Sequence, residues 1–334
     1  MSLTQASQLL TPEEIAVRAG QQVPFLHLPE RAGLFADREM RLRQRAAAHP
    51  MRDFLIFMAE LARTQHEVLQ AYPAVALPDA AALDAASRAG MPPLPAVDWP
   101  RDPVWRAQFR RLLDGLMPRL AGSPAQPAVQ ALRGIDDAQL EQQADRLLHN
   151  VMLGVDMAAA PLIAAGLQTY WTHLLLATQA ARGVDRLAPF GRTDDATRCP
   201  CCGSRPTASI SRIDATAGGY RYLHCSLCAA QWHMVRIKCS HCESTKGIHY
   251  QSLQPLAASG GTAKEAVEAE TCDECGHYLK IVHMERDAHV EPVADDLASV
   301  TLDLLVSEAG FDRHGVNLML LFGDPGNPDD GGGG

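Results

Sequence analysis

The sequence predicts a multidomain α+β protein, in which an all-helical N-terminal domain precedes two small rubredoxin-like or zinc-ribbon four-cysteine metal modules and a C-terminal helix. All nine cysteines lie between residues 199 and 275. The region before them shows helical periodicity, whereas the region after 207 consists of short strand-like runs. The chain has 334 residues. A single core usually stops growing at roughly 250 to 300 residues, so more than one domain is expected.

The helical domain is assigned to residues 1–190. Thr11 is a good N-cap; it is followed by Pro12, which suits a first turn, and by Glu14 three residues on, so a helix is expected to start there. Over 51–72, apolar residues recur at the spacing of an amphipathic helix. Similar patterns predict a domain of five to eight helices, separated by proline-rich breaks at 91–103 and 122–127; they lie at 31–48, 103–121, 137–149 and 156–182.

The most apolar stretch, 157–181, predicts a buried helix and not a membrane span. It is rich in alanine and is interrupted by Pro161, Gln168 and His173. No secretory signal is recognisable at the N-terminus, so the chain is expected to stay in the cytoplasm. The net charge of −9 disfavours a protein that binds nucleic acid or anionic lipid over its whole surface.

From residue 207 the sequence changes to short runs of β-branched and aromatic residues between turn signals. Strands are expected at 207–213, 220–225, 232–239, 248–253 and 278–284. A helix is expected over 293–311, and Gly310 suits its C-terminal end. The domain assignment is module 1 at 191–238, module 2 at 239–291, a C-terminal helix with a strand or extended tail at 292–323, and a disordered end at 324–334.

Eight of the cysteines form four C-x-x-C pairs. Such a pair closes a tight turn whose two sulfurs converge on one tetrahedral ion, so two pairs complete a shell of four thiolates. Long intervals of 22 and 29 residues fit two strands and a turn, and the short interval of 10 residues between Cys228 and Cys239 fits a linker. Site 1 is therefore predicted to consist of Cys199, Cys202, Cys225 and Cys228, and site 2 of Cys239, Cys242, Cys272 and Cys275. An interleaved pairing is the disfavoured alternative.

The ninth cysteine is predicted to be Cys201. Aligning C-P-C-C-G at 199–203 with C-D-E-C-G at 272–276 places Cys201 opposite Glu274, at a position that should point away from the ion. Cys201→Ser should therefore leave both metals bound.

Metal sites are favoured over two other uses of paired cysteines. Nothing marks a secretory route, so a disulfide framework is disfavoured, and four tandem pairs are an unusual way to build a thioredoxin-type centre. Ligand softness does not separate zinc from iron in a four-thiolate site. Such a site has no open position for water or substrate, which argues against metal-ion hydrolysis. His241 and His277 could each replace a ligand, but are interpreted as groups outside the shell.

An enzymatic function receives no support from the sequence. It contains no P-loop, no G-x-G-x-x-G after a strand, no G-x-S-x-G and no H-E-x-x-H. The doublets Asp136-Asp137 and Asp295-Asp296 are interpreted as acids at solvated helix starts. Residues 198–292 contain ten Lys or Arg and ten Asp or Glu, so a nucleic-acid-binding module is disfavoured.

Several blocks resemble the FdhE family, accessory proteins of formate dehydrogenase. They are LFADREMRLRQRAAAHPMRDFLIFMAELA (34–62), CSLCAAQWHMVRIKCSHC (225–242), AETCDECGHYLKIV (269–282) and PVADDLASVTLD (292–303). The resemblance covers most of the chain, and all four cysteine pairs match. It implies a helical domain followed by two rubredoxin-like modules, each with one metal ion, and iron as that metal, with zinc as the alternative.

The resemblance also implies a function. Such a protein is cytoplasmic, is not itself an enzyme, and binds the catalytic subunit of respiratory formate dehydrogenase before export through the twin-arginine pathway. The leading hypothesis is therefore a maturation chaperone with structural or redox-sensing metal sites and no membrane insertion. The alternatives are a zinc-ribbon nucleic-acid-binding or transcription-associated protein and, third, a thiol–disulfide oxidoreductase. The oligomeric state is left open, a homodimer included.

Overall fold

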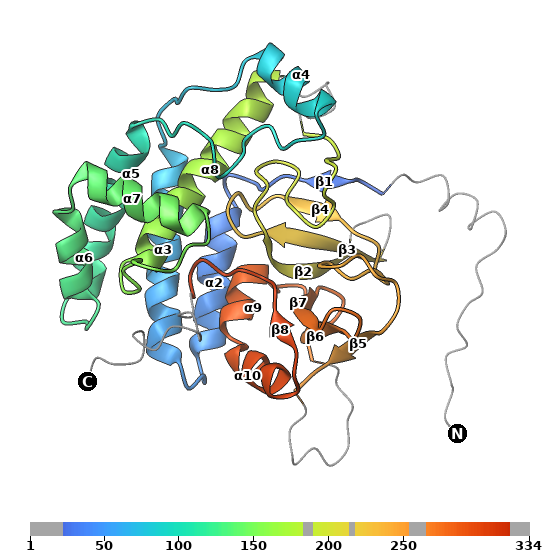
Figure 1. Cartoon of the computed structure of the whole chain (residues 1–334). Coiled ribbons are helices and arrows are strands. Elements are labelled where there is room, and N and C mark those ends of the chain that lie inside the picture. Colours follow the sequence, from blue (N-terminus) through green and yellow to red (C-terminus); the bar gives the residue numbers. More distant parts are fainter. Residues whose placement is uncertain (1–22, 183–189, 214–217, 254–264, 321–334) are drawn as a thin grey trace.

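The computed structural model describes residues 23–182, 190–213, 218–253 and 265–320 (Figure 1). The helix expected to start at Thr11 and the end expected to be disordered, 324–334, lie outside these residues. The described parts form a helical region beside a mixed β-sheet, with two short helices covering part of the sheet. The predicted α+β class is confirmed.

The predicted helices are present, with small changes at their ends. They are α2 (Leu34–Ala46), α3 (Arg52–Gln70), α5 (Val104–Leu116) continued by the 3₁₀ turn η1 (Met117–Leu120), α7 (Asp137–Leu148) and α8 (Ala160–Arg182). Two further helices were not predicted, α4 (Ala80–Arg88) and α6 (Gln126–Arg133). Asp79 caps α4 by accepting a hydrogen bond from the Ala82 N–H, and Pro127 lies in the first turn of α6, where proline is tolerated.

Helix α8 is the centre of the helical region. Nearly all of its residues up to Leu175 are buried, and it packs against α3, α5 and α7. Gly166 allows close packing, because a Cβ atom there would lie 2.8 Å from the ring of Phe109. The prediction of a buried helix at this stretch is confirmed. Among the described residues, no helix combines the length and apolar character needed to cross a membrane.

The strands form one sheet in the order β1-β4-β3-β2-β7-β6-β5, with β8 paired to β7. Their bounds are β1 Leu26–His27, β2 Pro206–Ile213, β3 Gly218–Cys225, β4 Gln231–His233, β5 Ile248–Gln251, β6 Val267–Cys272, β7 His277–His283 and β8 Asp312–Arg313. The antiparallel strands β2–β4 and β5–β7 form two ribbons, one for each cysteine cluster. Parallel pairing of β2 with β7 joins the ribbons into one sheet.

The first ribbon shares a core with the helical region. Its four paired cysteines belong to the same cluster of buried side chains as Leu167, Trp171 and Leu174 of α8. The Gln168 side-chain amide donates a hydrogen bond of 2.7 Å to the Ser226 carbonyl, which lies between two of those cysteines. Strand β1, which precedes the helices in the sequence, pairs with β4 and so adds an N-terminal strand to the same sheet. The helical region and first ribbon therefore form one packed unit.

The C-terminal helix predicted over 293–311 is two helices, α9 (Pro292–Leu297) and α10 (Val300–Glu308). Ser299 lies at the break between the two helices, and its hydroxyl donates a hydrogen bond of 2.7 Å to the Asp295 carbonyl of the preceding turn. Gly310 follows α10 with a positive φ of 91°, as predicted for a helix end. Within 316–320 the chain forms a turn and not a strand, and Leu318 and Met319 are buried there.

The doublet Asp295-Asp296 is not at a solvated helix start, so that prediction was wrong. Both residues are fully buried inside α9. Asp295 accepts two hydrogen bonds from the Arg41 Nε and one of 2.7 Å from its Nη2, whereas Asp296 pairs with Lys280 at 2.9 Å and with Arg313 at 2.8 Å. Successive residues of a helix point about 100° apart, which lets the two carboxylates face opposite neighbours. The other doublet follows the prediction: Asp136 caps α7 through the Gln139 N–H.

These ion pairs connect α9 to both of its neighbours. Arg38 and Arg41 of α2 pair with Glu291 and Asp295 at the start of α9. On its other side, Lys280 of β7 also pairs with Asp303 of α10 at 2.6 Å. Removing one member of such a buried pair leaves an uncompensated charge, so these contacts hold α2, α9 and the sheet in one arrangement.

Candidate metal centres

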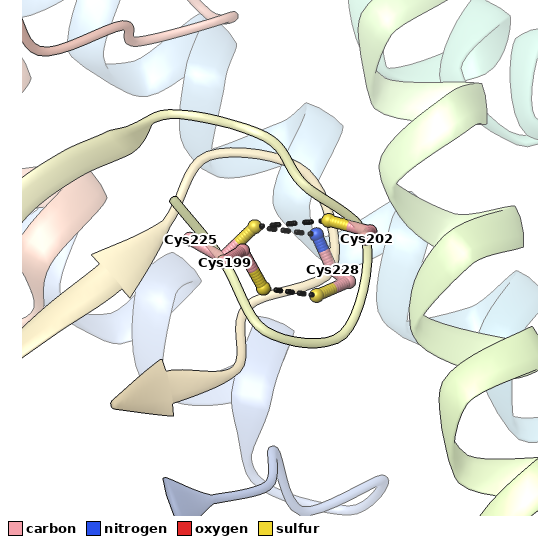
Figure 2. A group of neighbouring side chains, drawn as sticks. All are labelled: Cys199, Cys202, Cys225 and Cys228. Atoms are coloured by element: carbon pink, nitrogen blue, oxygen red, sulfur yellow. Dashed lines mark hydrogen bonds between the residues drawn. The ribbon is translucent and has the colours of Figure 1, made fainter. Parts of the chain in front are cut away.

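The first cysteine cluster is formed by two turns of the first ribbon. One turn, before β2, carries Cys199 and Cys202, and the other, after β3, carries Cys225 and Cys228. All four Sγ atoms lie within 4.8 Å of one another, and all four residues are buried. Figure 2 shows the side chains pointing toward a common centre. The Sγ atoms of Cys199 and Cys228 lie 3.6 Å apart, and those of Cys202 and Cys225 lie 3.4 Å apart.

Backbone N–H groups point at the sulfurs of this cluster. The amides of Leu227 and Cys228 both donate to the Cys225 Sγ at 3.4 Å. Burial raises the pKa of the Cys225 and Cys228 thiols. Burial alone would also raise the pKa of Cys199, but hydrogen bonds from the neighbouring thiols lower it well below its ordinary value. A cluster that holds negative charge in the core is suited to a cation.

The second cluster lies nearer the surface. Its four sulfurs also lie within 4.8 Å of one another, with 3.8 Å between Cys239 and Cys275 and 3.8 Å between Cys242 and Cys272. Cys242 is exposed and Cys275 is half-buried. The His241 N–H donates to the Cys239 Sγ at 3.3 Å. The structure therefore brings together each set of four that the spacing predicts, one in the core and one at the surface.

The donor sets fit a tetrahedral metal ion. A metal–sulfur distance of about 2.3 Å gives sulfur–sulfur distances of roughly 3.8 Å around a tetrahedron. The paired sulfurs lie 3.4 to 3.8 Å apart in the two clusters. A disulfide would require about 2.05 Å. Four converging thiols with N–H groups aimed at them are the arrangement that a zinc or iron ion requires.

All four cysteine turns share one backbone feature. The residue after the second cysteine has a positive φ in each: 73° at Gly203, 59° at Ala229, 61° at Glu243 and 68° at Gly276. In three of these turns its N–H donates back to the carbonyl of the first cysteine, at 2.8 to 3.1 Å. The sequence shows this signal only where glycine occupies the position. At Ala229 and Glu243 the surrounding turn imposes the left-handed conformation on an L-residue.

Gly276→Ala tests the cost of this conformation alone. A Cβ atom at Gly276 would meet nothing within 4 Å, so the substitution adds strain without a clash. We expect the free energy of unfolding to fall by about 1 kcal/mol, measured by denaturant unfolding, with full metal content. The matched control is Gly134→Ala, at a residue with negative φ, which should not reduce stability by that amount. An unchanged stability for Gly276→Ala would contradict the argument.

Cys201 lies outside both sets of four. It is fully buried in the core beside the first cluster, and its carbonyl accepts the Leu94 N–H at 3.0 Å. Burial, together with Cys199, raises its pKa well above the ordinary value, so the thiol stays protonated. Cys201 is therefore a core residue, and its turn contacts the loop before α5 through this hydrogen bond.

We expect Cys201→Ser to keep both metal ions. The serine hydroxyl replaces a buried thiol in the core, so stability should fall by about 1 to 3 kcal/mol while the metal content stays at two per chain. Metal analysis by plasma mass spectrometry, with Cys201→Ala as the apolar control, measures this. Loss of one ion in both variants would mean that the assignment of ligands in site 1 is wrong.

A group of histidines lies beside the second cluster. The rings of His241 and His277 stack at 4.0 Å, and each offers a nitrogen within 4.8 Å of the Cys275 Sγ. Burial, with these two rings, lowers the pKa of His314 to about 3, and His314 lies 3.0 Å from the Ser240 hydroxyl. Three imidazole rings therefore lie together beside this cluster, because His241 contacts both His277 and His314. The prediction that His241 and His277 stay outside the shell remains a prediction.

Sequence reasoning missed the environment of the clusters. Nothing in the cysteine spacing indicates that one cluster is buried against α8 and the other exposed. The buried arginines of α2 were also missed, although Arg38 and Arg41 fall on the same side of the helix as Phe35 and Leu42. That interruption of an apolar stripe by arginines was the available signal for a buried ion pair.

Models of the FdhE family match three consecutive parts of the chain. The FdhE N-terminal model matches residues 23–186, the FdhE central domain residues 198–236, and the FdhE C-terminal domain residues 237–320. The central match contains all four cysteines of the first cluster, and the C-terminal match contains all four of the second.

Similar proteins of known name support the same assignment. An FdhE homolog of Klebsiella pneumoniae is 39% identical over 92% of this chain and 94% of its own length, and one of Cronobacter sakazakii is 38% identical over the same shares. The crystal structure of the FdhE protein from Pseudomonas aeruginosa superposes with a TM-score of 0.74, at 39% identity, over 90% of this chain and 100% of that one. With the helical region, the single sheet and both four-cysteine clusters in place, the chain belongs to the FdhE family.

Proposed function

We propose that this chain is a non-catalytic accessory protein for the maturation of respiratory formate dehydrogenase. It binds the catalytic subunit of that enzyme in the cytoplasm, before export through the twin-arginine pathway. The observation that carries the proposal is the pair of four-cysteine clusters in a chain of the FdhE family. Four thiolates fill a tetrahedral shell and leave no position for a substrate, so the metal ions serve structure or sensing and not hydrolysis.

In this proposal each cluster holds one metal ion, and iron is the resident metal. Cys199, Cys202, Cys225 and Cys228 are the ligands of site 1, and Cys239, Cys242, Cys272 and Cys275 those of site 2. The buried site 1 stabilises the joint core, because metal binding to such small turns is largely folding energy. Site 2 holds together the exposed turns of the second ribbon, which supplies the surface for the client protein.

Metal analysis tests the first half of the proposal. Protein purified without added metal should contain about two iron ions per chain, and its absorption spectrum should show the sulfur-to-iron charge-transfer bands of ferric tetrathiolate sites. Two zinc ions would keep the ligand assignment and overturn iron as the resident metal. If zinc-loaded and iron-loaded protein restored enzyme activity equally, a redox role for the metal would also be excluded.

Affinity capture and complementation test the second half. A tagged copy should retain the precursor of the formate dehydrogenase catalytic subunit, and a strain without this protein should lose formate dehydrogenase activity. Supplying the wild-type chain should restore that activity, whereas a chain in which both Cys242 and Cys275 are serine should restore less. Full activity in the strain without the protein would overturn the proposed function, whatever the metal content.

A further inference from the structure

A cavity lies beside the first ribbon, where three parts of the chain meet. This cavity has a volume of about 420 Å³ and is lined by residues from β1 and α2, from β2–β4, and from the loop before α9. Those segments belong to the N-terminal, central and C-terminal family regions respectively. Cavities at such junctions, of roughly 300 to 1,000 Å³, are where small ligands usually bind.

His224 contributes an unused N–H donor to this cavity. The Gln231 side-chain oxygen accepts a hydrogen bond from Arg212 at 2.8 Å, so its nitrogen must be the atom that donates to the His224 Nδ1 at 3.2 Å. An imidazole that accepts at Nδ1 carries its hydrogen on Nε2. The His224 side chain is only 2% exposed, and its Nε2 has no hydrogen-bond partner among the described residues.

Arg212 contributes a second unused donor. Its Nε atom is buried and has no partner within the described parts of the chain, and its guanidinium pairs with no carboxylate there. Buried N–H groups are rarely left without an acceptor, because removing them from water without a replacement bond is costly. Two such donors, one of them cationic, in the wall of the same cavity call for an anionic acceptor such as a carboxylate.

Carboxylates line the cavity as well: Glu291 is buried and paired with Arg38, whereas the unpaired carboxylates are exposed. Glu30 and Asp37 both line the cavity, both are exposed, and neither forms an ion pair with any described residue. Leu28, Ile210 and Met284 add apolar surface to the lining. A ligand that satisfies all of these groups carries a carboxylate at its buried end and a cation at its exposed end.

We propose that the cavity binds a small zwitterionic molecule of the size of a short peptide. Its carboxylate accepts from the His224 Nε2–H and from Arg212, and its ammonium group lies against Glu30 and Asp37. Binding bridges the three family regions and stabilises their arrangement. No cysteine of either cluster lines the cavity, and the proposal does not depend on the proposed role in enzyme maturation.

The probe for this proposal is trialanine, added to the intact, metal-loaded protein labelled with ¹⁵N-histidine. The His224 Nε2–H signal should shift and saturate with increasing trialanine. Trialanine amide, which lacks the carboxylate, and N-acetyl-trialanine, which lacks the ammonium group, should each bind about 10-fold or more weakly. These blocked peptides test the site without any substitution in the protein.

Arg212→Met provides an independent test. It keeps much of the side-chain length and removes the charge, and should weaken trialanine binding by about 10-fold or more. The matched control is Arg236→Met, three residues after β4 and outside the cavity wall, which should bind trialanine like the wild type. Metal content and thermal midpoint check the folding of both variants. Absence of a saturable shift, or equal binding of trialanine and its amide, would overturn the proposal.

Discussion

Replacing Cys225 with serine is expected to remove one of the two metal ions and to unfold the helical region at a much lower temperature. Cys225 accepts two backbone N–H groups and lies in the same core as α8. Apparent binding free energies of structural zinc are roughly 10 to 16 kcal/mol, comparable with the roughly 5 to 15 kcal/mol that stabilise a whole domain. Loss of this ion should therefore lower the free energy of unfolding of the chain by several kcal/mol.

The measurement combines metal analysis with thermal unfolding followed by circular dichroism at a helix-sensitive wavelength. Cys242→Ser is the matched control, because Cys242 belongs to the exposed cluster. That variant should also lose one ion, but its helices should unfold within a few degrees of the wild-type midpoint. If the two variants lowered the helical midpoint equally, site 1 would have no special role in the core. Two ions in Cys225→Ser would remove this residue from the ligand set.

Asp296→Asn is expected to destabilise the protein by about 3 to 5 kcal/mol. Asp296 is 1% exposed and faces two cations, Lys280 and Arg313, while its Oδ2 also accepts from the Asn317 side chain at 2.8 Å. The neutral amide leaves Asp303 as the only carboxylate for both cations among the residues that the structure describes. Denaturant unfolding measures the loss. The control Asp114→Asn, in an exposed pair with Arg133, should change little.

The same carboxylate predicts part of the acid sensitivity. Burial alone would raise the pKa of Asp296, but Arg313 and Lys280 lower it to about 2. An unfolded aspartate has a pKa of about 3.9. Because the folded pKa is the lower one, the stabilisation is fully present above pH 4 and is lost as the pH falls toward 2. Asp296→Asn should make stability less dependent on pH between 4 and 2, and an unchanged slope would contradict the pairing.

Local sequence patterns predicted most of the helices and the grouping of the cysteines. A C-x-x-C turn depends on a few neighbouring residues, and the interval between two turns is set by the two strands that join them. The apolar stripe of 51–72 likewise depends on residues within a few turns of helix. These features involve short separations along the chain, and they can be recognised without knowing what the segment packs against.

Contacts between distant segments could not be predicted in this way. The parallel pairing of β2 with β7, which joins the two ribbons, has no local signal, because any strand with suitable side chains can supply the hydrogen bonds. Asp295-Asp296 resembles a helix start in sequence, and only the positions of Arg41 and Lys280 explain why both acids are buried. The donor of His224 depends on three side chains, His224, Gln231 and Arg212, that meet only in the folded sheet.

The ion pairs between α2 and α9 also constrain how the protein folds as it is made. Arg41 and Asp295 lie 254 positions apart. At a synthesis rate of roughly 5 to 20 residues per second, the ribosome reaches Asp295 on the order of 10 to 50 s after Arg41. Strand β1 likewise can pair only after β4 has been synthesised. The arginines of α2 therefore have no partners from α9 until nearly the whole chain has been synthesised. A chain that ends before α9 lacks these ion pairs altogether.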